Sequence, residues 1–448
     1  MTNSYAKLMG NNTTVRVEVI AGITTFLTMA YIIFVNPSIL SLEGVNLPGV
    51  EKMDKQALIA ATCLVSGISS IIVGIFANAP IAMAPGMGLN AFFASLLISG
   101  KMDWQTALGA VFISGFIFLI LTLLGLRKRL VEAIPASLVS GIAVGIGLFI
   151  TFIGLVKLGI VVGDEHTYVK AGPINGTVLI GLLGLLVMIT FEMKKIKGGL
   201  VIGILVSTIL AIIFKLTAMP EKLVSMDINI RKVAFHLDIF GALKWGFFGS
   251  IFTLMFIDMF DSLGTLVACC YQAGMIDENK KIRGLDRLLS IDAIATMIGA
   301  LLGTSTTTAY MESAAGIEQG GRTGLTAIVT GILFLLSVLF VPVVGIVPEY
   351  ATAPALIMVG LFMMREIKNI DFHNLEEAFP AFIIMVMIAL SYSISTGLAF
   401  GFISFVVIKL VLLKPREIKP AMWIIAILSL LFLAVGQLPA LIDYIKTL

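Results

Sequence analysis

Long stretches without a single charged residue decide what this chain can fold into. Four of them contain more than the roughly 20 residues that cross the hydrocarbon core of a bilayer, namely 104–126, 133–156, 323–348 and 420–442. Residues 56–100 are long enough for two crossings. Charged residues make up only 13% of the chain, whereas soluble domains carry about 25%. The sequence therefore predicts an all-α polytopic membrane protein.

Loops and helix-breaking residues divide the chain into fifteen candidate spans. The first seven lie near 17–40, 57–78, 81–99, 104–126, 133–157, 174–192 and 198–218. After a polar stretch, 219–242, the next seven lie near 243–266, 286–303, 304–317, 323–342, 347–364, 379–394 and 397–413. The last, 421–442, is an extra C-terminal hydrophobic segment that either crosses the membrane or lies in its interface.

Basic residues in the loops indicate which end of the chain faces the cytoplasm. Positive clusters follow the fourth and sixth spans and precede the ninth: Arg127, Lys128, Arg129, Lys194, Lys195, Lys197, Lys280, Lys281, Arg283 and Arg287. All of them lie on one side if the N-terminus is cytoplasmic, as the positive-inside rule expects. Lys414, Arg416 and Lys419 share that side only if 379–394 and 397–413 are two spans. We expect a multi-pass protein of the cytoplasmic membrane with a cytoplasmic N-terminus.

Signatures of catalysis and metal binding are missing from the sequence. It has no GxxxxGK(S/T) phosphate loop and no HExxH zinc motif. Cys63, Cys269 and Cys270 lie in or beside apolar segments, without the paired spacing and histidine partners of metal ligands. The net charge of +3 comes from short loops and gives no reason to expect nucleic acid. We expect no enzyme activity, no metal and no cofactor.

Two candidate spans are short and broken. The first contains ANAPIAMAPGMGLNAFF (77–93), where prolines and glycines prevent a continuous helix, and the second contains GTSTTTAYMESAAGIEQGG (303–321), where a Ser-Thr run favours extended backbone. Non-helical backbone at membrane depth survives only where protein buries it or it lines a cavity. Paired broken segments in two halves of a chain indicate the central binding site of a transporter.

Four acidic residues fall well inside candidate spans: Asp258, Asp261, Asp292 and Glu312. An ionised acid at the bilayer centre costs about 2.5–3.5 kcal/mol on the insertion scale. Each is either a ligand or proton site, or a structural acid bonded to hydroxyls of a neighbouring helix. Glu312 lies inside the second broken segment, and Asp261 shares a helix face with Asp258. These positions favour a functional role for Glu312 and Asp261 ahead of Asp258, whereas Asp292 is the most readily explained as interfacial.

Asn90 follows the first break directly. Its amide offers both a donor and an acceptor, which suits the edge of a heterocycle, but asparagine also caps helices and holds membrane helices together. Both interpretations of Asn90 remain open at this point.

Four stretches together carry a resemblance to a known family. AGITTFLTMAYIIFVNPSIL (21–40), MAPGMGLNAFF (83–93), FIDMFDSLGTL (256–266) and TSTTTAYMESAAGIEQGGRTGLTA (304–327) resemble the AzgA-like purine permeases. These belong to the nucleobase–cation symporter superfamily, which also contains the uracil and xanthine permeases. The resemblance extends over nearly the whole chain up to about residue 413.

The resemblance implies fourteen spans in two inverted repeats of seven, with short antiparallel strands in spans 3 and 10. Spans 1–4 and 8–11 would form a core domain (17–126 and 243–342), and spans 5–7 and 12–14 a gate domain (133–218 and 347–413). It further implies a homodimer through the gate domain and an elevator-like movement of the core domain against it.

The resemblance also implies roles for individual residues. It places the two acids that hold the base on Asp261 and Glu312, and the span 3 pattern GLN on Gly88 and Asn90. The wider superfamily often has Glu where Asp261 stands and Asn where Ser313 stands, and both departures favour the purine branch. Glu312 would accept an N–H of the base, while Asp261 binds another edge or carries the coupled proton. Asp258 is a further proton-coupling candidate.

The implied function is secondary active import of a purine nucleobase, such as hypoxanthine, guanine or adenine, by proton symport. A sodium-coupled nucleobase symporter is the first alternative. An anion transporter or channel on the same fold is the second, although such a site should be ringed by Arg or Lys in the membrane, whereas the buried charges here are acids. A membrane-embedded enzyme would need clustered metal ligands, which the sequence lacks.

Overall fold

The structure, a computed structural model, describes residues 13–43, 51–100, 102–125, 134–220, 222–225, 229–244, 247–275 and 282–447, with only the backbone from residue 435 onward. Five basic residues used above to orient the chain, Arg127, Lys128, Arg129, Lys280 and Lys281, lie outside the described residues. The same holds for the N-terminal residues 1–12 and for the predicted domain limits 126 and 133.

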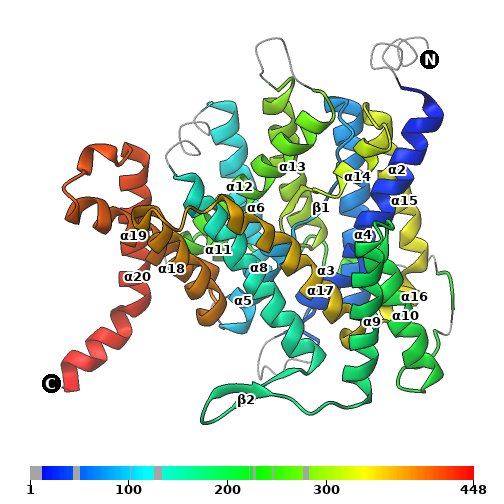
Figure 1. Ribbon diagram of the computed structural model, residues 1–448, viewed down its shortest axis with the longest axis horizontal. Coiled ribbons are helices and arrows are strands. Elements are labelled where there is room, and N and C mark those ends of the chain that lie inside the picture. The colour runs from blue at the N-terminus through cyan, green and yellow to red at the C-terminus, as the bar shows by residue number, and fades with distance from the viewer. Residues whose placement is uncertain are drawn as a thin grey trace.

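Every candidate span contains a helix, in the predicted order (Figure 1). The first half contains α2 (Val15–Met29), α3 (Ile32–Leu40), α4 (Lys55–Ile72), α5 (Met87–Ile98), α6 (Trp104–Leu123), α8 (Ala136–Leu158), α9 (Gly176–Met193) and α10 (Gly199–Ile213). The second contains α12 (Phe248–Gln272), α13 (Leu285–Leu302), α14 (Ser313–Glu318), α15 (Gly324–Ser337), α17 (Glu349–Met364), α18 (Leu375–Ser391), α19 (Ile394–Val411) and α20 (Pro420–Thr447). In the described part of the chain, nine helical segments are long and apolar enough to cross a membrane. The all-α polytopic class is confirmed, while the number of crossings remains a prediction.

The start of α2 and a short hairpin mark opposite ends of the bundle (Figure 1). The hairpin joins β2 (Val161–Asp164) to β3 (Tyr168–Ala171), and the sequence analysis did not predict it. Asp164 organises its turn: the ammonium of Lys170 and the backbone N–H groups of Thr167 and His166 lower the pKa of this carboxyl to about 2. From the hairpin's end of the bundle, α17 runs back toward the end where α2 begins (Figure 1).

The two broken segments pair as strands inside the helical bundle. β1 (Met83–Pro85) and β4 (Thr307–Ala309) are antiparallel, with Ala84 opposite Thr308. Side chains satisfy the outer edge of β1, because the Ser70 hydroxyl bonds both the N–H (3.0 Å) and the carbonyl (3.2 Å) of Met83. Every residue of both strands is buried. The predicted antiparallel strands in spans 3 and 10 are confirmed.

The first span is divided, although its sequence predicted one helix. Helix α2 ends at Met29, and hydrogen bonds from Ile33 N to Ala30 O and from Phe34 N to Tyr31 O tighten the chain before α3 continues. The break places Tyr31, which is 2% exposed, in the interior beside the second broken segment. The phenol hydroxyl of Tyr31 therefore reaches Glu312 from the first span.

Helices from the two halves of the chain pack in two groups. Helices α2 and α4 contact α15, and α6 contacts α12 and α13. Helix α8 packs instead against α17 and α18, and α9 against α10 and α17. The assignment of 17–126 and 243–342 to a core domain, and of 133–218 and 347–413 to a gate domain, remains a prediction.

A buried carboxylate ties the first helix to the second half of the chain. Glu18 on α2 is fully buried and accepts hydrogen bonds from the backbone N–H of Arg322 (2.9 Å) and the hydroxyl of Thr326 (2.5 Å). It also accepts from the backbone N–H groups of Thr323 and Thr326. Because the first N–H groups of a helix have no partner within the helix, this acid caps α15 from a distant segment.

Candidate functional site

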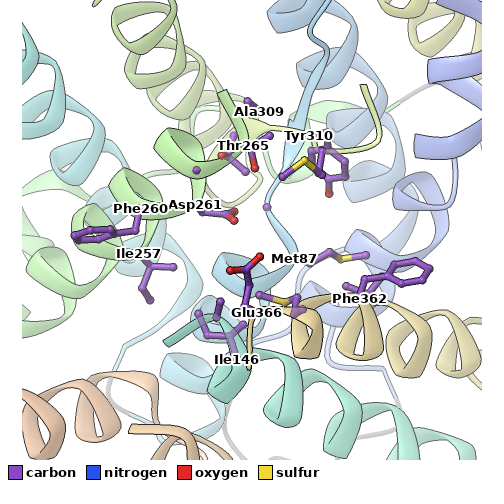
Figure 2. Close-up of a pocket in the computed structure, with 18 of the residues that line it drawn as sticks. Met87, Ile146, Ile257, Phe260, Asp261, Thr265, Ala309, Tyr310, Phe362 and Glu366 are labelled. Atoms are coloured by element: carbon purple, nitrogen blue, oxygen red, sulfur yellow. The ribbon is translucent and has the colours of Figure 1, made fainter. Parts of the chain in front are cut away.

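A cavity of about 480 Å³ lies beside the crossing strands (Figure 2). Its strand-side wall consists of Tyr31, residues 86–88 and lining residues from 257–268 and 308–312. The opposite wall, here called the α8–α17 wall, consists of lining residues from 139–146 and 359–366. The cavity therefore lies between the two groups of packed helices.

Asp261 projects into this cavity from α12 (Figure 2). Among the described residues, no donor hydrogen-bonds its carboxylate, so both oxygens are available to a ligand. The backbone of Gly86 comes close: a Cβ added there would lie 3.7 Å from Asp261 Oδ2 and 2.8 Å from Thr308 Cγ2. Glycine at the start of α5 is therefore required by the close approach of Thr308, and Asp261 lies within ordinary contact distance of the same position.

Glu312 lines the same cavity and stands at the N-cap position of α14. Its carboxylate does not cap this helix. Instead, Oε1 accepts a hydrogen bond from the hydroxyl of Tyr31 at 2.6 Å. Among the described residues, the only further donor to this carboxylate is the backbone N–H of Glu312 itself, so no other residue occupies Oε2 and this oxygen can accept a hydrogen bond from a ligand. The structure thus brings Asp261 and Glu312 into one cavity.

Gly88 also lines the cavity, at the start of α5. A Cβ at this position would lie 2.9 Å from Ile146 Cγ2 on the opposite wall. Tyr310 donates its hydroxyl to the carbonyl of Pro85 at 2.6 Å and so ties the end of β1 to the end of β4. The first residues of α5 thus shape the cavity by leaving space in it.

Asn90, Ser313 and Asp258 lie outside the cavity lining. The Asn90 side-chain oxygen accepts a hydrogen bond from the Ser305 hydroxyl, just before β4. The Ser313 hydroxyl accepts from the backbone N–H of Ala82 at 3.0 Å, just before β1. Both contacts connect one broken segment to the other.

Asp258 is fully buried one helical turn from Asp261. It accepts hydrogen bonds from the hydroxyls of Thr296 (3.2 Å) and Ser262 (3.5 Å). The Ser262 oxygen lies 2.6 Å from the hydroxyl of Thr308, and Thr308 lines the cavity. A row of hydroxyl groups therefore leads from the cavity to this acid. Asp292, which the sequence suggested as interfacial, is also fully buried.

Sequence reasoning missed Tyr31 and Glu366, which also line the cavity. Tyr31 escaped notice because its partner Glu312 is 281 positions away in the chain, and the only local signal is a phenol in an apolar span. Glu366 lies just after the end of α17, in what the sequence suggested was a loop, yet it lines the cavity. Figure 2 shows its carboxylate extending from the α8–α17 wall toward the side from which Asp261 projects.

Among the described residues, the charged side chains that face the cavity are all negative. Asp261, Glu312 and Glu366 line it, and the described lining contains no Lys, Arg or His. A desolvated carboxylate without a cationic partner is costly, so a ligand that donates N–H groups, or a proton, would stabilise this site. In the described part of the chain, no group of three or more His, Cys, Asp or Glu residues could hold a metal ion.

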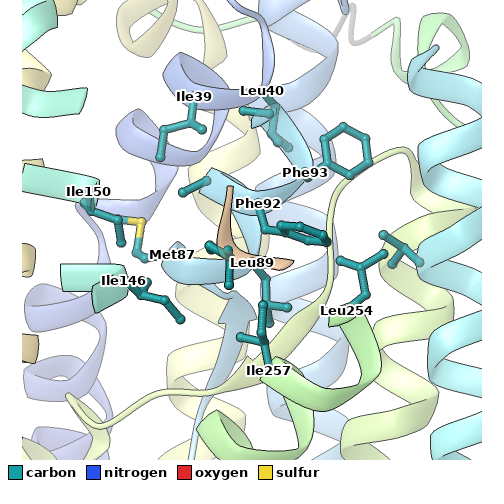
Figure 3. Close-up of a cluster of buried hydrophobic side chains, with 14 of the residues drawn as sticks. Ile39, Leu40, Met87, Leu89, Phe92, Phe93, Ile146, Ile150, Leu254 and Ile257 are labelled. Atoms are coloured by element: carbon teal, nitrogen blue, oxygen red, sulfur yellow. The ribbon is translucent and has the colours of Figure 1, made fainter. Parts of the chain in front are cut away.

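An apolar cluster borders the cavity and shares Met87, Ile146 and Ile257 with its lining (Figure 3). It brings together side chains of α3, α5, α8 and α12, among them Leu40, Phe92, Ile150 and Leu254. Gly264, Ala268, Met311 and Glu366 also line the cavity and are exposed. The cavity therefore has an open mouth beside Glu366 and an apolar floor beneath α5.

Comparisons with known proteins point to one family. The family model described as "Permease family" matches residues 16–400. The chain is 45% identical to a putative permease of Methanocaldococcus jannaschii, covering 96% of both chains. It is 41% identical to the adenine permease AdeP of Escherichia coli, covering 96% of this chain and 95% of the relative. It is 43% identical to the guanine/hypoxanthine permease PbuG of Bacillus subtilis, covering 94% and 96%.

Solved structures match at the level of the fold. The transmembrane domain of the cyanobacterial bicarbonate transporter BicA aligns with a TM-score of 0.64 at 16% identity, covering 85% of this chain and 96% of that domain. SLC26A9 aligns with a TM-score of 0.60 at 10% identity, covering 89% of this chain and 66% of that one. At such identities the likeness shows a shared fold alone.

Proposed function

Because this chain belongs to the Permease family, in its branch of purine nucleobase permeases, we propose that it imports a purine nucleobase together with a proton. It is a transporter rather than an enzyme. The observation that carries the proposal is the pair of carboxylates, Asp261 and Glu312, in a cavity without basic residues in its described lining. Purine bases present N–H donors on their edges, and carboxylate oxygens are the acceptors that match them.

Proton coupling follows from the cost of these charges. Asp261 and Glu312 share one cavity, and an ionised acid in a membrane interior is expensive. Binding of a proton to one acid would remove one of the two charges, and hydrogen bonds from N–H groups of the neutral base would stabilise the remaining charge before the cavity changes sides. Asp258 is the third candidate, since hydroxyl groups connect it to the cavity. Sodium coupling is the alternative.

The proposed cycle is an elevator-like movement of the core domain against a gate domain that forms a homodimer. The open mouth lies where α12 and α17 end and α8 begins. With a cytoplasmic N-terminus, which the positive-inside rule favours, this mouth faces the cytoplasm. The protein then sits in the cytoplasmic membrane in an inward-open state, with the apolar floor sealing the outer side.

An anion transporter on the same fold is the competing function, because the structural neighbours include a bicarbonate transporter. The acids that line the cavity argue against an anion transporter. Repulsion from Asp261, Glu312 and Glu366 would oppose the binding of an anion, and the described lining offers no cation to offset it.

Uptake of radiolabelled hypoxanthine into cells that lack their own purine carriers tests the proposal. The competitors are unlabelled guanine, adenine, xanthine and uracil, with and without a protonophore. We expect competition by purines and loss of uptake when the protonophore collapses the proton gradient. Removal of sodium at fixed pH should leave uptake unchanged, and dependence on sodium would assign the coupling to that ion instead. No uptake of any base by inserted protein would refute the proposed substrate class.

A further inference from the structure

Glu366 is the one ionisable residue that the α8–α17 wall contributes to the described lining of the cavity. The α8–α17 wall is formed by apolar side chains together with Ser140 and Glu366. Asp261 and Glu312 both come from the opposite wall. Glu366 belongs to η5 (Arg365–Asn369), the short helix that follows α17. A base that leaves Asp261 and Glu312 through the mouth must pass this side chain.

The position of the Glu366 carboxylate is fixed by the protein. Asn369 donates a hydrogen bond to Glu366 Oε2 at 2.6 Å. Among the described residues, no donor contacts Oε1. Figure 2 shows the carboxylate extending into the cavity rather than away from it. The side chain therefore presents one acceptor oxygen toward a passing ligand.

Among the described residues, no cation forms an ion pair with this carboxylate. Arg365 pairs with Glu192 (3.5 Å) and lies over the ring of Phe362, and Lys368 is exposed on the same short helix. Helices α8 and α17, which pack against η5, carry Lys157 and Glu349 at their far ends, where these two pair at 2.5 Å. Because Glu366 is exposed to solvent, a charge at this position carries a smaller desolvation cost than the charge of a buried acid.

We propose that Glu366 selects ligands by charge at the mouth of the cavity. Its Oε1 accepts a hydrogen bond from an N–H of a neutral base, and its charge repels a base that has lost a proton. This inference rests on the proposed transport of nucleobases and adds a specificity-determining residue on the wall opposite Asp261 and Glu312. Repulsion between unit charges several ångströms apart in a largely aqueous mouth corresponds to about threefold to tenfold in affinity.

The test uses two bases of nearly the same shape and different acidity. Hypoxanthine stays neutral around neutral pH, whereas 8-azahypoxanthine, in which nitrogen replaces one ring C–H, is more acidic and becomes an anion. The purified full-length protein in detergent exposes both sides of the membrane domain, so its orientation does not affect binding. The quantity measured is the inhibition constant of 8-azahypoxanthine divided by the dissociation constant of radiolabelled hypoxanthine. The ratio is measured across the pH range in which the analogue ionises. Any protein group whose titration changes the binding of both bases equally leaves this ratio unchanged.

Three variants separate the charge of Glu366 from other effects. Glu366→Gln keeps the shape and removes the charge, and Asn369→Ala keeps the charge and removes the hydrogen bond that fixes it. Glu165→Gln makes the same substitution at an exposed glutamate of the β2–β3 hairpin, far from the cavity. Retained binding of hypoxanthine shows that each variant is folded.

In the wild-type protein, the ratio is expected to rise as the analogue ionises, and to rise less steeply at high salt because salt screens exposed charges. In Glu366→Gln the rise should be smaller by about threefold to tenfold, and Asn369→Ala and Glu165→Gln should retain most of it. An equally steep rise in Glu366→Gln, with hypoxanthine still bound, refutes the role of Glu366 and leaves the proposed function in place. Failure of the wild-type protein to bind hypoxanthine overturns the proposed function and this inference with it.

Discussion

The two broken segments pair residue for residue as strands, yet they bring different things to the cavity. The first, β1 with Gly86 and α5, contains no charged residue, and its half-helix is 12 residues long. The second, β4 with α14, carries Glu312, and its half-helix is only 6 residues long. One segment therefore supplies space and the other supplies charge.

This difference shows how an inverted pair of segments can be specialised. In the first segment, Gly86 leaves room for Thr308, and Gly88 leaves room for Ile146. In the second segment, Tyr310 bonds back to β1, while Glu312 is held by Tyr31 from the first span. Substitutions in the second segment and at its partners should therefore change the binding of the base itself. Substitutions in the first should act through the shape of the cavity.

The largest effect is expected from Glu312→Gln. The amide keeps the shape of the side chain but cannot hold the charge, so the charge-assisted hydrogen bond to the base is lost. Such bonds contribute about 1.5–3 kcal/mol each, and uptake should fall by about 100-fold or more because proton coupling is lost with it. The measurement is hypoxanthine uptake normalised to the amount of protein in the membrane fraction. Normal transport by this variant would show that Glu312 does not bind the base. It would also refute the idea that the second segment supplies the charge of the site.

Asp261→Asn should have the next largest effect. Asp261 faces the cavity beside Gly86 and has no donor among the described residues. The substitution should weaken purine binding about tenfold, because a charged hydrogen-bond acceptor is lost. Alternatively, it should separate uptake from the proton gradient, because a proton-binding group is lost. Affinity and the pH profile of uptake, measured together, distinguish the two results. If affinity and pH profile both remain unchanged, Asp261 is not part of the binding site.

Tyr31→Phe should have a moderate effect on the same carboxylate. The substitution removes only the hydroxyl that donates to Glu312 Oε1 at 2.6 Å and leaves the ring in place. A hydrogen bond to a charged group is worth about 1.5–3 kcal/mol, but the freed oxygen can turn toward the base, so we expect a loss of affinity of about fivefold. Phe149→Leu, in a buried ring outside the cavity lining, is a packing control. Equal losses in both variants would mean that Tyr31 acts through packing.

The pattern of residues was sufficient to predict the broken segments, and to single out Glu312 within the second segment and Asp261 in another apolar span. Prolines and glycines at 80–88 and the Ser-Thr run at 305–308 stop a helix locally, and a carboxylate in an apolar span is conspicuous wherever it stands. These signals lie within a few residues of one another. The strands formed where they were expected, and Asp261 and Glu312 face one cavity.

The contacts that hold these residues could not be predicted in the same way. Tyr31 meets Glu312, and Glu18 meets Thr326, across about 300 positions of the chain. Glu18 stands near the start of its span and looks like an interfacial residue, although it is fully buried. Glu366 follows a span and looks like a loop residue, although it reaches the cavity. In each case tertiary packing decides the role, and one sequence does not show which helices pack together.

The smallest effect is expected from Asn90→Ala, which tests whether the first segment acts through shape. Asn90 stands on the first turn of α5 close to Gly88, and it accepts a hydrogen bond from Ser305 just before β4. Without the amide, the buried Ser305 hydroxyl loses its partner, at a cost of about 1–3 kcal/mol if it stays unpaired, and the strands should shift slightly. The ranking of hypoxanthine, guanine and adenine in competition should then change by about twofold to fivefold, more than the maximal rate of uptake. A lower melting temperature with an unchanged ranking would limit Asn90 to holding the two segments together. The contrast between a segment for shape and a segment for charge would then rest on Gly86 and Gly88 alone.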